Sequence, residues 1–235
     1  MQGAAALKHQ VFHSSVGLGA HPFPARYAET FHARWGKRAF DICLAVLLLP
    51  ILLPVICGLA ALAALVALDG GVPFFGHSRV GRGGREFRCW KIRTMVPDAQ
   101  GCLAQHLAEN AEAAEEWEIT QKLEHDPRTT RLGRFLRMSS LDELPQLFNV
   151  LRGEMSFVGP RPVEPEELGR YGLSAGVYKR LRPGITGLWQ VSGRNDLAYD
   201  QRVALDVKYA KELNWRGDIL IIFRTLSVVA GLTGR

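Results

Sequence analysis

One segment stands apart in the pattern of hydrophobic and polar positions, because no residue from Ile42 to Leu68 is charged. It is longer than the ~20 apolar residues that cross the hydrocarbon core of a bilayer as a helix. Pro50 and Pro54 lie near its middle. Each lacks an N–H and crowds the preceding turn, so we expect a sharp kink there. Folded at the prolines, each arm would reach roughly 20 Å, short of the ~30 Å core. The pattern therefore predicts a re-entrant helix-break-helix hairpin, although a kinked complete span or a buried core helix would also fit.

The flanks of this segment carry basic residues on both sides, and basic flanks belong on the cytoplasmic side of a membrane. They are Arg26, Arg34, Lys37 and Arg38 upstream, and Arg79, Arg82, Arg85, Arg88, Lys91 and Arg93 downstream. Just before the apolar segment, Tyr27, Phe31 and Trp35 recur every fourth residue and form one aromatic helical face. Aromatic and basic side chains in this arrangement suit the headgroup region, although a stripe packed in a core would look the same.

The rest of the chain predicts short strands and amphipathic helices. Val72–Phe75 and Glu86–Ile92 are typical of two strands of a hairpin, with Gly81, Gly83 and Gly84 in the turn. Residues 98–124 predict an acidic, solvated helix, and Tyr199–Gly234 predicts helices with apolar faces. Residues 1–25 show no periodicity and are interpreted as a mobile tail.

The net charge of +6, with a pI near 9.3, implies an anionic partner such as a nucleic acid, an acidic lipid or nucleotide phosphates. The four cysteines show no CxxC pairing, which argues against a disulfide framework or a zinc site and fits a reducing compartment. No signal peptide is expected, because the first long apolar run begins only at Ile42.

The glycine-rich turn and the strand after it carry a cluster of cations that suits phosphate oxygens. Its members are Arg82, Arg85, Arg88, Lys91 and Arg93. The turn lacks the GKS/T ending of a P-loop. A solvated or lipid-facing basic surface would explain the cluster equally well.

The stretch from Asp126 to Pro162 carries the candidate chemistry. Arginines recur in it at every third position, at Arg128, Arg131, Arg134 and Arg137. Ser140 and Glu143 fit a capping box that would open a helix. An aspartate in the first turn, such as Asp142, would stay ionised and could attack phosphorus. Asp142 and Glu143 could together hold Mg²⁺ on a diphosphate. Plain helix capping, with no catalytic role for Asp142, remains the alternative.

The order of several short motifs along the chain resembles the bacterial sugar transferase family, the small monotopic phosphoglycosyl transferases that prime glycan assembly on a lipid carrier. The resemblance runs from Lys37 to the C-terminus. Its landmarks are the proline-broken apolar segment, Lys91-Ile92-Arg93-Thr94-Met95, Asp126-Pro127-Arg128, Ser140-Leu141-Asp142-Glu143-Leu144-Pro145-Gln146, Val158-Gly159-Pro160-Arg161-Pro162, Arg182-Pro183-Gly184 and Ser192-Gly193-Arg194. One departure is that Leu49 and Leu53 precede the two prolines, where the family usually has serine.

The resemblance implies a reaction and a role for each matching residue. Asp142 would take the phosphosugar from a UDP-sugar and release UMP, with Glu143 holding Mg²⁺ and assisting proton movement. The family's basic positions, expected around the diphosphate and uridine, are Lys91, Arg137, Arg161, Arg182 and Arg194, and Arg93 joins them as a phosphate-binding candidate. The acceptor would be undecaprenyl phosphate, and the sugar galactose or glucose, priming exopolysaccharide synthesis.

The predicted fold is α+β and mostly helical. It comprises the tail (1–25), an interfacial helix with the re-entrant hairpin (26–69) and a transferase domain (70–235) on the cytoplasmic face of the bacterial inner membrane. Membrane lipids are expected partners, and self-association is left open. A catalytically silent membrane scaffold is the alternative function. Nucleic-acid binding is not expected, because the arginines accompany an acidic pair and a membrane segment.

Overall fold

The computed structural model describes residues 32–67, 71–120, 123–193 and 197–230. The expected tail and the aromatic residues Tyr27 and Phe31 lie outside these residues. The elements are α1 Lys37–Ala67, β1 Phe74–Val80, β2 Glu86–Ile92, α2 Ala99–Glu109, α3 Ala111–Thr120, α4 Arg131–Met138, α5 Gln146–Arg152, β3 Ser156–Val158, α6 Pro165–Leu168, α7 Ala175–Tyr178, β4 Gly184–Thr186, α8 Tyr199–Glu212 and α9 Trp215–Ala230. The α+β, mostly helical class predicted from the sequence is confirmed.

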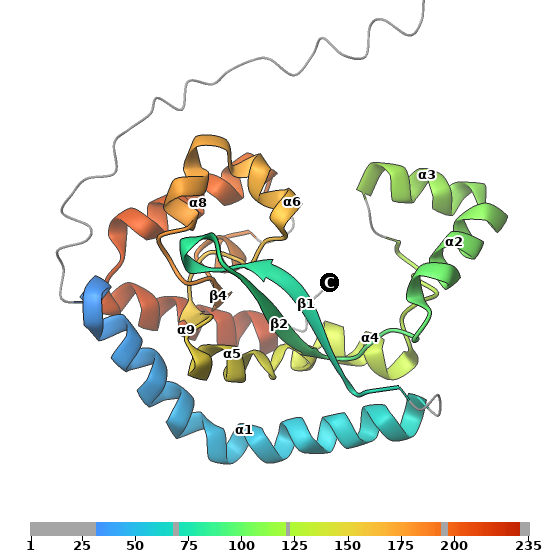
Figure 1. The fold of residues 1–235 in the computed structure, drawn as a ribbon, viewed down its shortest axis with the longest axis horizontal. Coiled ribbons are helices and arrows are strands. Elements are labelled where there is room, and N and C mark those ends of the chain that lie inside the picture. The colour runs from blue at the N-terminus through green and yellow to red at the C-terminus, as the bar shows by residue number, and fades with distance from the viewer. Residues whose placement is uncertain (1–31, 68–70, 121–122, 194–196, 231–235) are drawn as a thin grey trace, which may run out of the picture.

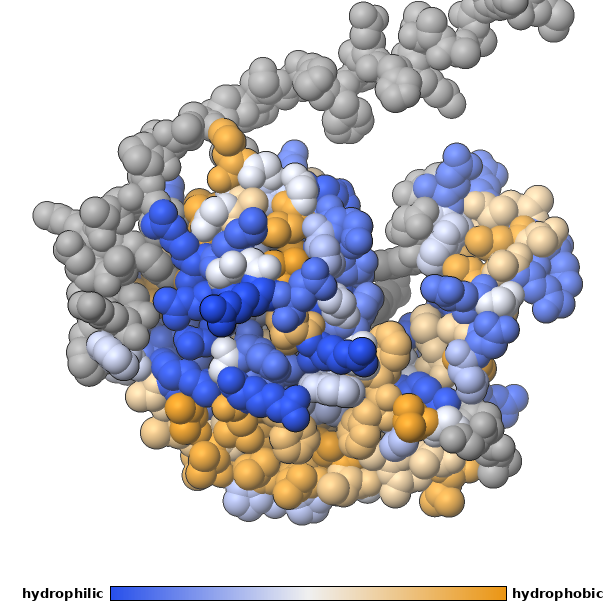
Figure 2. All heavy atoms as spheres, in the orientation of Figure 1, coloured by the Kyte–Doolittle hydropathy of each residue, from blue (hydrophilic) through white to orange (hydrophobic). Residues whose placement is uncertain are grey.

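Helix α1 continues through both prolines, but it changes direction partway along and curves beneath the rest of the protein (Figure 1). Its outer face is apolar, with Leu47 and Leu65 each 71% exposed. In the same orientation as Figure 1, where α1 runs along the lower edge, Figure 2 shows a hydrophobic band at this edge. By length and composition, Lys37–Val66 is the one candidate membrane span among the described residues, and an 18-residue window within it has a mean hydropathy of 2.9. The expected bend is therefore present, whereas the re-entrant path remains a prediction.

Polar contacts fix the first turns of α1 to the domain above it. The buried carboxylate of Asp41 accepts hydrogen bonds from Ser156 Oγ at 2.9 Å and Phe157 N at 3.1 Å. Lys37 Nζ lies 2.9 Å from a carboxylate oxygen of Asp218, which is fully buried in α9. Buried charges are costly unless they are paired or hydrogen-bonded, so these contacts hold α1 in one position against the domain.

Strands β1 and β2 form an antiparallel hairpin in which Phe74 pairs with Ile92 and Val80 with Glu86. Gly83 and Gly84 have φ angles of 75° and 77°, which explains why the turn needs glycine. The second strand has the predicted bounds. The first prediction, Val72–Phe75, was wrong in its bounds, because Gly76, His77 and Ser78 lack strand-like alternation yet pair with β2.

Strands β3 and β4 form a second, parallel pair. In its register, Ser156 lies opposite Gly184 and Val158 lies opposite Thr186. The backbone passes very close to itself beside this pair. A Cβ at Gly184 would overlap the backbone N of Gly159, and a Cβ at Gly159 would overlap the carbonyl of Arg182. Glycine is therefore required at these two positions for the segment before β4 to reach its place.

The helices largely follow the sequence pattern. The acidic segment forms α2 and α3, which meet at Asn110 and stand away from the main body (Figure 1). The C-terminal segment forms α8 and α9. Helix α9 buries Ile221 and exposes Phe223, so it packs on the domain while leaving an apolar outer face.

Asn149, which is fully buried in α5, joins this helix to the edge of β2. Its Oδ1 accepts a hydrogen bond from Trp90 N at 3.1 Å, and its Nδ2 donates to Arg88 O at 2.7 Å and to Glu154 Oε2 at 2.6 Å. The amide thus satisfies backbone groups of β2 and positions the strand against α5.

We predict that Asn149→Ala lowers the free energy of unfolding by about 2–4 kcal/mol, because it leaves buried polar groups without partners. Thermal unfolding in detergent measures the change, with Gln100→Ala at an exposed position of α2 as the control. An Asn149→Ala midpoint equal to that of the control would contradict this role.

Candidate active site

A lysine on β2 faces two adjacent carboxylates. Lys91 Nζ lies 2.6 Å from Glu143 Oε1 and 3.9 Å from Asp142 Oδ2. Lys91 is fixed in the hairpin, whereas the carboxylates lie on the turn between α4 and α5. Residues about 50 positions apart in the chain are thereby brought to one point.

The carboxylates lie on a short 3₁₀ turn, Leu141–Glu143, that precedes α5. The predicted capping box is wrong. Ser140 has a left-handed backbone (φ 57°) and makes no side-chain cap, whereas a capping residue normally has extended backbone angles. The carboxylate of Glu143 accepts a hydrogen bond from Lys91, and only the backbone N of Glu143 bonds to Ser140, at its carbonyl oxygen. The turn therefore does not cap a helix, and it places both carboxylates near Lys91.

The two carboxylates differ in their environments. Burial raises the pKa of Asp142 to about 6; the charge of Glu143 adds to this effect, and Lys91 opposes it. Burial also acts to raise the pKa of Glu143, but Lys91, Arg161 and a hydrogen bond from Gln146 outweigh it and bring the pKa below its usual value. Near neutral pH both groups are mainly ionised, and Asp142 is the more basic of the two.

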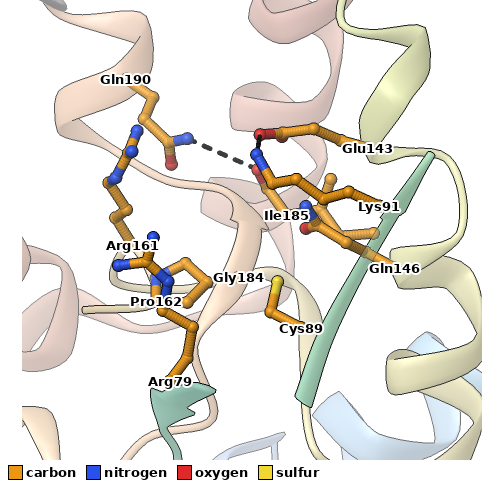
Figure 3. A pocket seen from close by; sticks show the side chains of 10 residues that line it. All are labelled: Arg79, Cys89, Lys91, Glu143, Gln146, Arg161, Pro162, Gly184, Ile185 and Gln190. Carbon is orange, nitrogen blue, oxygen red and sulfur yellow. Dashed lines mark hydrogen bonds and ion pairs between the residues drawn. The ribbon is translucent and has the colours of Figure 1, made fainter. Parts of the chain in front are cut away.

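Glu143 and Lys91 line one side of a shallow, open pocket of about 30 Å³. Arg79 and Arg161 lie on the opposite side (Figure 3). The remaining lining residues are Cys89, Gln146, Pro162, Gly184, Ile185 and Gln190. A space of this size holds a few waters or an ion, so a larger ligand would extend from it over the open surface. With three cations and one anion, the lining suits a phosphate or diphosphate.

The other predicted cations within the described residues, Arg93, Arg137 and Arg182, are not among the residues that line this pocket. Arg137 donates from Nε to Thr94 Oγ1 at 2.9 Å, and its charge lowers the pKa of Asp142, so it lies near the carboxylates without lining the pocket. Arg93 follows β2 directly, with its backbone N bonded to Pro73 O. Arg182 does not line the pocket, because its Nε donates to Gly153 O at 2.8 Å. Arg194 lies outside the described residues.

Sequence reasoning missed four polar or thiol-bearing residues of the lining. Gln146 lies in the segment quoted for the resemblance, three residues after Glu143, and could have been found there. Arg79 was noted only as a basic flank, although it lines the pocket, and its Nη1 lies 3.1 Å from Oε1 of Glu164, which is not among the lining residues. Nothing in the sequence marked Cys89 or Gln190, which reach the pocket only through the fold.

Asp142 and Glu143 are the candidate ligands for a magnesium ion. No group of three or more His, Cys, Asp or Glu residues that could hold a metal occurs in the described parts of the chain. Mg²⁺, however, is often held by one or two carboxylates together with substrate phosphates, and it prefers oxygen donors. The adjacent carboxylates beside a basic pocket fit this requirement, with the remaining ligands left to a phosphate and water.

These features define a class of protein: one with a long apolar helix and, above it, a basic pocket that Lys91 and Glu143 line, next to the buried Asp142, which does not itself line the pocket. A sequence profile of the family described as "Bacterial sugar transferase" matches residues 32–231, and the chain belongs to this family.

The chain is also similar to individual proteins. It is 49% identical over 197 residues to the UDP-galactose-lipid carrier transferase of Erwinia amylovora, covering 84% of this chain and 41% of that protein. The same identity, length and shares apply to the undecaprenyl-phosphate galactose phosphotransferase of Salmonella typhimurium. Identity is 47% over 193 residues to the exopolysaccharide production protein ExoY of Sinorhizobium fredii, covering 82% of this chain and 84% of that protein. The chain thus spans less than half of the first two proteins and most of ExoY.

We predict that Asp142→Asn stabilises the protein at pH 8 in buffer without Mg²⁺. The folded-state pKa of about 6 lies above the ordinary aspartate value of 3.8, so the wild type loses stability as pH rises from about 4 to about 6. Removing the charge would recover up to about 3 kcal/mol above that range and almost nothing at pH 4. Thermal unfolding in detergent at both pH values measures this difference.

Glu118→Gln, at an exposed position of α3, is the control for loss of one negative charge. If Asp142→Asn were less stable than the wild type at pH 8, or if the difference did not depend on pH, burial would not be the dominant influence on Asp142.

Proposed function

We propose that this protein transfers a hexose-1-phosphate from a UDP-sugar to undecaprenyl phosphate, through a covalent intermediate on Asp142. The observation that carries the proposal is the buried Asp142, 3.9 Å from Lys91 and next to Glu143, since Lys91 and Glu143 both line a basic pocket. Family membership and relatives named as lipid-carrier and undecaprenyl-phosphate transferases support the substrate class.

In the first step, a carboxylate oxygen of Asp142 attacks the phosphorus that bears the sugar. The bond from this phosphorus to the bridging oxygen breaks, and that oxygen leaves with its electron pair as part of UMP. The product is an acyl phosphate on Asp142. In the second step, an oxygen of undecaprenyl phosphate attacks the same phosphorus, and the carboxylate of Asp142 leaves. The lipid then carries a diphosphate linked to the sugar, and no proton is lost or gained overall if both phosphates react as anions.

The electrostatics of the site support this division of roles. The pKa of Asp142, raised by burial to about 6, leaves a carboxylate that is ionised at neutral pH but more basic, and so more nucleophilic, than an exposed aspartate. Lys91 and Arg161 would bind oxygens of the diphosphate and balance the charge that develops on the departing UMP.

Mg²⁺ is part of the proposal, held by Asp142 and Glu143 together with oxygens of the substrate. When bound, it would neutralise diphosphate charge and make the phosphorus more electrophilic. Lys91 already neutralises part of Glu143, at 2.6 Å, and keeps that side chain directed toward the pocket.

We further propose that α1 enters only one leaflet of the bacterial inner membrane and returns to the cytoplasmic face. The bend of α1, its exposed apolar outer face and the polar contacts at its start support this arrangement (Figures 1 and 2). Both the water-soluble donor and the phosphate of a lipid acceptor could then reach the pocket. For the sugar, galactose is favoured, because two relatives are named for galactose, and glucose is the second candidate. The product would prime exopolysaccharide synthesis, in line with the name of the ExoY relative.

We predict that detergent-purified protein with Mg²⁺ and undecaprenyl phosphate releases UMP from one or two sugars of a UDP-sugar panel. Asp142→Asn should abolish release, since a neutral amide cannot act as the nucleophile. Glu143→Gln and Lys91→Met should lower kcat by about 10²–10⁴-fold, the range typical for loss of one group that stabilises developing charge or assists proton transfer.

Arg131→Gln, an exposed change on α4, should leave the rate unchanged. Full activity of Asp142→Asn would exclude the nucleophile while leaving the transferase function intact. A folded protein that releases UMP from no sugar would instead favour the silent scaffold.

A further inference from the structure

Two arginines from separate parts of the chain meet at the C-terminal end of α5, and the turn that carries a third packs against the segment before one of them. Arg38, in the first turn of α1, donates from Nη1 to Val150 O at 2.6 Å and from Nη2 to Leu151 O at 3.0 Å. Arg182, just before β4, donates from Nε to Gly153 O at 2.8 Å. Arg82 comes from the turn between β1 and β2.

Two contacts bring the segments that carry these arginines together. A Cβ at Gly153, whose carbonyl binds Arg182, would lie 3.4 Å from Arg38 Nη2, and Gly83 N donates to Lys179 O at 2.7 Å, which joins the turn that carries Arg82 to the segment before Arg182. Burial lowers the pKa of Arg182, the positive charges of Arg82 and then Arg38 lower it further, and Asp41 opposes them. Asp41 is itself engaged by Ser156 and Phe157. Among the ion pairs of the described residues, none joins one of these three arginines to a carboxylate.

Capping of α5 explains only part of this cluster. The C-terminal end of a helix carries about half a negative charge, and its free carbonyls accept hydrogen bonds from cations. Arg38 and Arg182 already make such bonds, and the end of one short helix cannot neutralise three guanidinium groups. Arg82 is exposed and adds a further charge where like charges repel. The cluster therefore carries uncompensated positive charge that the fold holds in place.

The position of the cluster indicates what would neutralise it. Arg38 precedes Ile42, where the uncharged part of α1 begins, by four residues, or roughly 6 Å along the helix. This depth corresponds to the headgroups of a bilayer that contains α1. A guanidinium presents a planar fork of donors that matches phosphate oxygens, and two of the three forks are held by hydrogen bonds to the backbone.

The cluster is distinct from the pocket that Lys91, Glu143 and Arg161 line. Neither Arg38, Arg82 nor Arg182 is among the residues that line that pocket. A phosphate bound at the cluster would lie outside this pocket, where we place the donor diphosphate, so it would not be the donor. A phospholipid of the surrounding bilayer meets both constraints, since its headgroup lies at the right depth and it takes no part in the reaction.

We propose that Arg38, Arg82 and Arg182 form a binding site for the phosphate of an anionic phospholipid headgroup, separate from the pocket, which fixes the start of α1 at the membrane surface. The site joins α1, the β1–β2 turn and the segment before β4, so an occupied site would stabilise the attachment of α1 to the domain.

The test is a titration of the detergent-purified full-length chain with short-chain phosphatidylglycerol, followed by the thermal unfolding midpoint. Short-chain phosphatidylcholine, inorganic phosphate and undecaprenyl phosphate are titrated in parallel. The wild type should be stabilised by phosphatidylglycerol, and Arg82→Gln should weaken this binding about tenfold through loss of one charge-assisted contact. Arg82 is exposed in a turn, so this change should not disturb folding. Arg82→Lys should restore part of the affinity, and Arg131→Gln, with the same loss of charge elsewhere, should bind as the wild type does.

Equal weakening in Arg82→Gln and Arg131→Gln would show general charge attraction and overturn the proposal. Stabilisation by inorganic phosphate as strong as that by phosphatidylglycerol would assign the cluster to a soluble anion. An Arg82-dependent response to undecaprenyl phosphate alone would assign it to the acceptor. Either result would overturn the phospholipid assignment.

Discussion

The site depends on one ion pair, the 2.6 Å contact between Lys91 and Glu143, made where the edge of a hairpin meets the turn before α5. A buried aspartate next to a second carboxylate is unfavourable, because burial and like charge both disfavour ionisation. Lys91 offsets part of this penalty for both groups and leaves Asp142 with a pKa of about 6. Asn149 holds β2 against α5, so the lysine reaches the carboxylates from a fixed strand. The protein thus accepts a destabilising charge at the residue that the proposed reaction uses as its nucleophile.

At the start of α1, polar contacts likewise offset the cost of buried charge and fix one element against another. A long apolar helix would have no fixed relation to a catalytic domain if only hydrophobic contacts joined them, since most of its outer face is exposed. Asp41 and Lys37 supply directional contacts to the β3 region and to α9. In a bilayer, they would fix the height of the pocket above the lipid, which a reaction between a soluble donor and a membrane-bound acceptor requires.

Much of this arrangement could be predicted from the sequence where a strong local signal exists. The uncharged run with its prolines predicted α1 and its bend, and the order of motifs placed Asp142, Glu143 and Lys91 at one site. The failures have physical causes. Ser140 and Glu143 match the letters of a capping box, but the backbone of Ser140 is left-handed, and a distant lysine outcompetes the local contact. Arg79, Gln190 and the position of Arg182 depend on long-range packing, which no local pattern encodes.

The central claim is that Asp142 becomes covalently attached to the phosphosugar, and mass spectrometry tests it most directly. The purified protein would be mixed with Mg²⁺ and UDP-galactose or UDP-glucose without a lipid acceptor, quenched quickly in acid, digested and analysed. The account predicts a phosphohexose on the peptide that carries Asp142, absent from Asp142→Asn, and UMP in equal amount. UMP release without an adduct, or an adduct on another residue, would contradict the account.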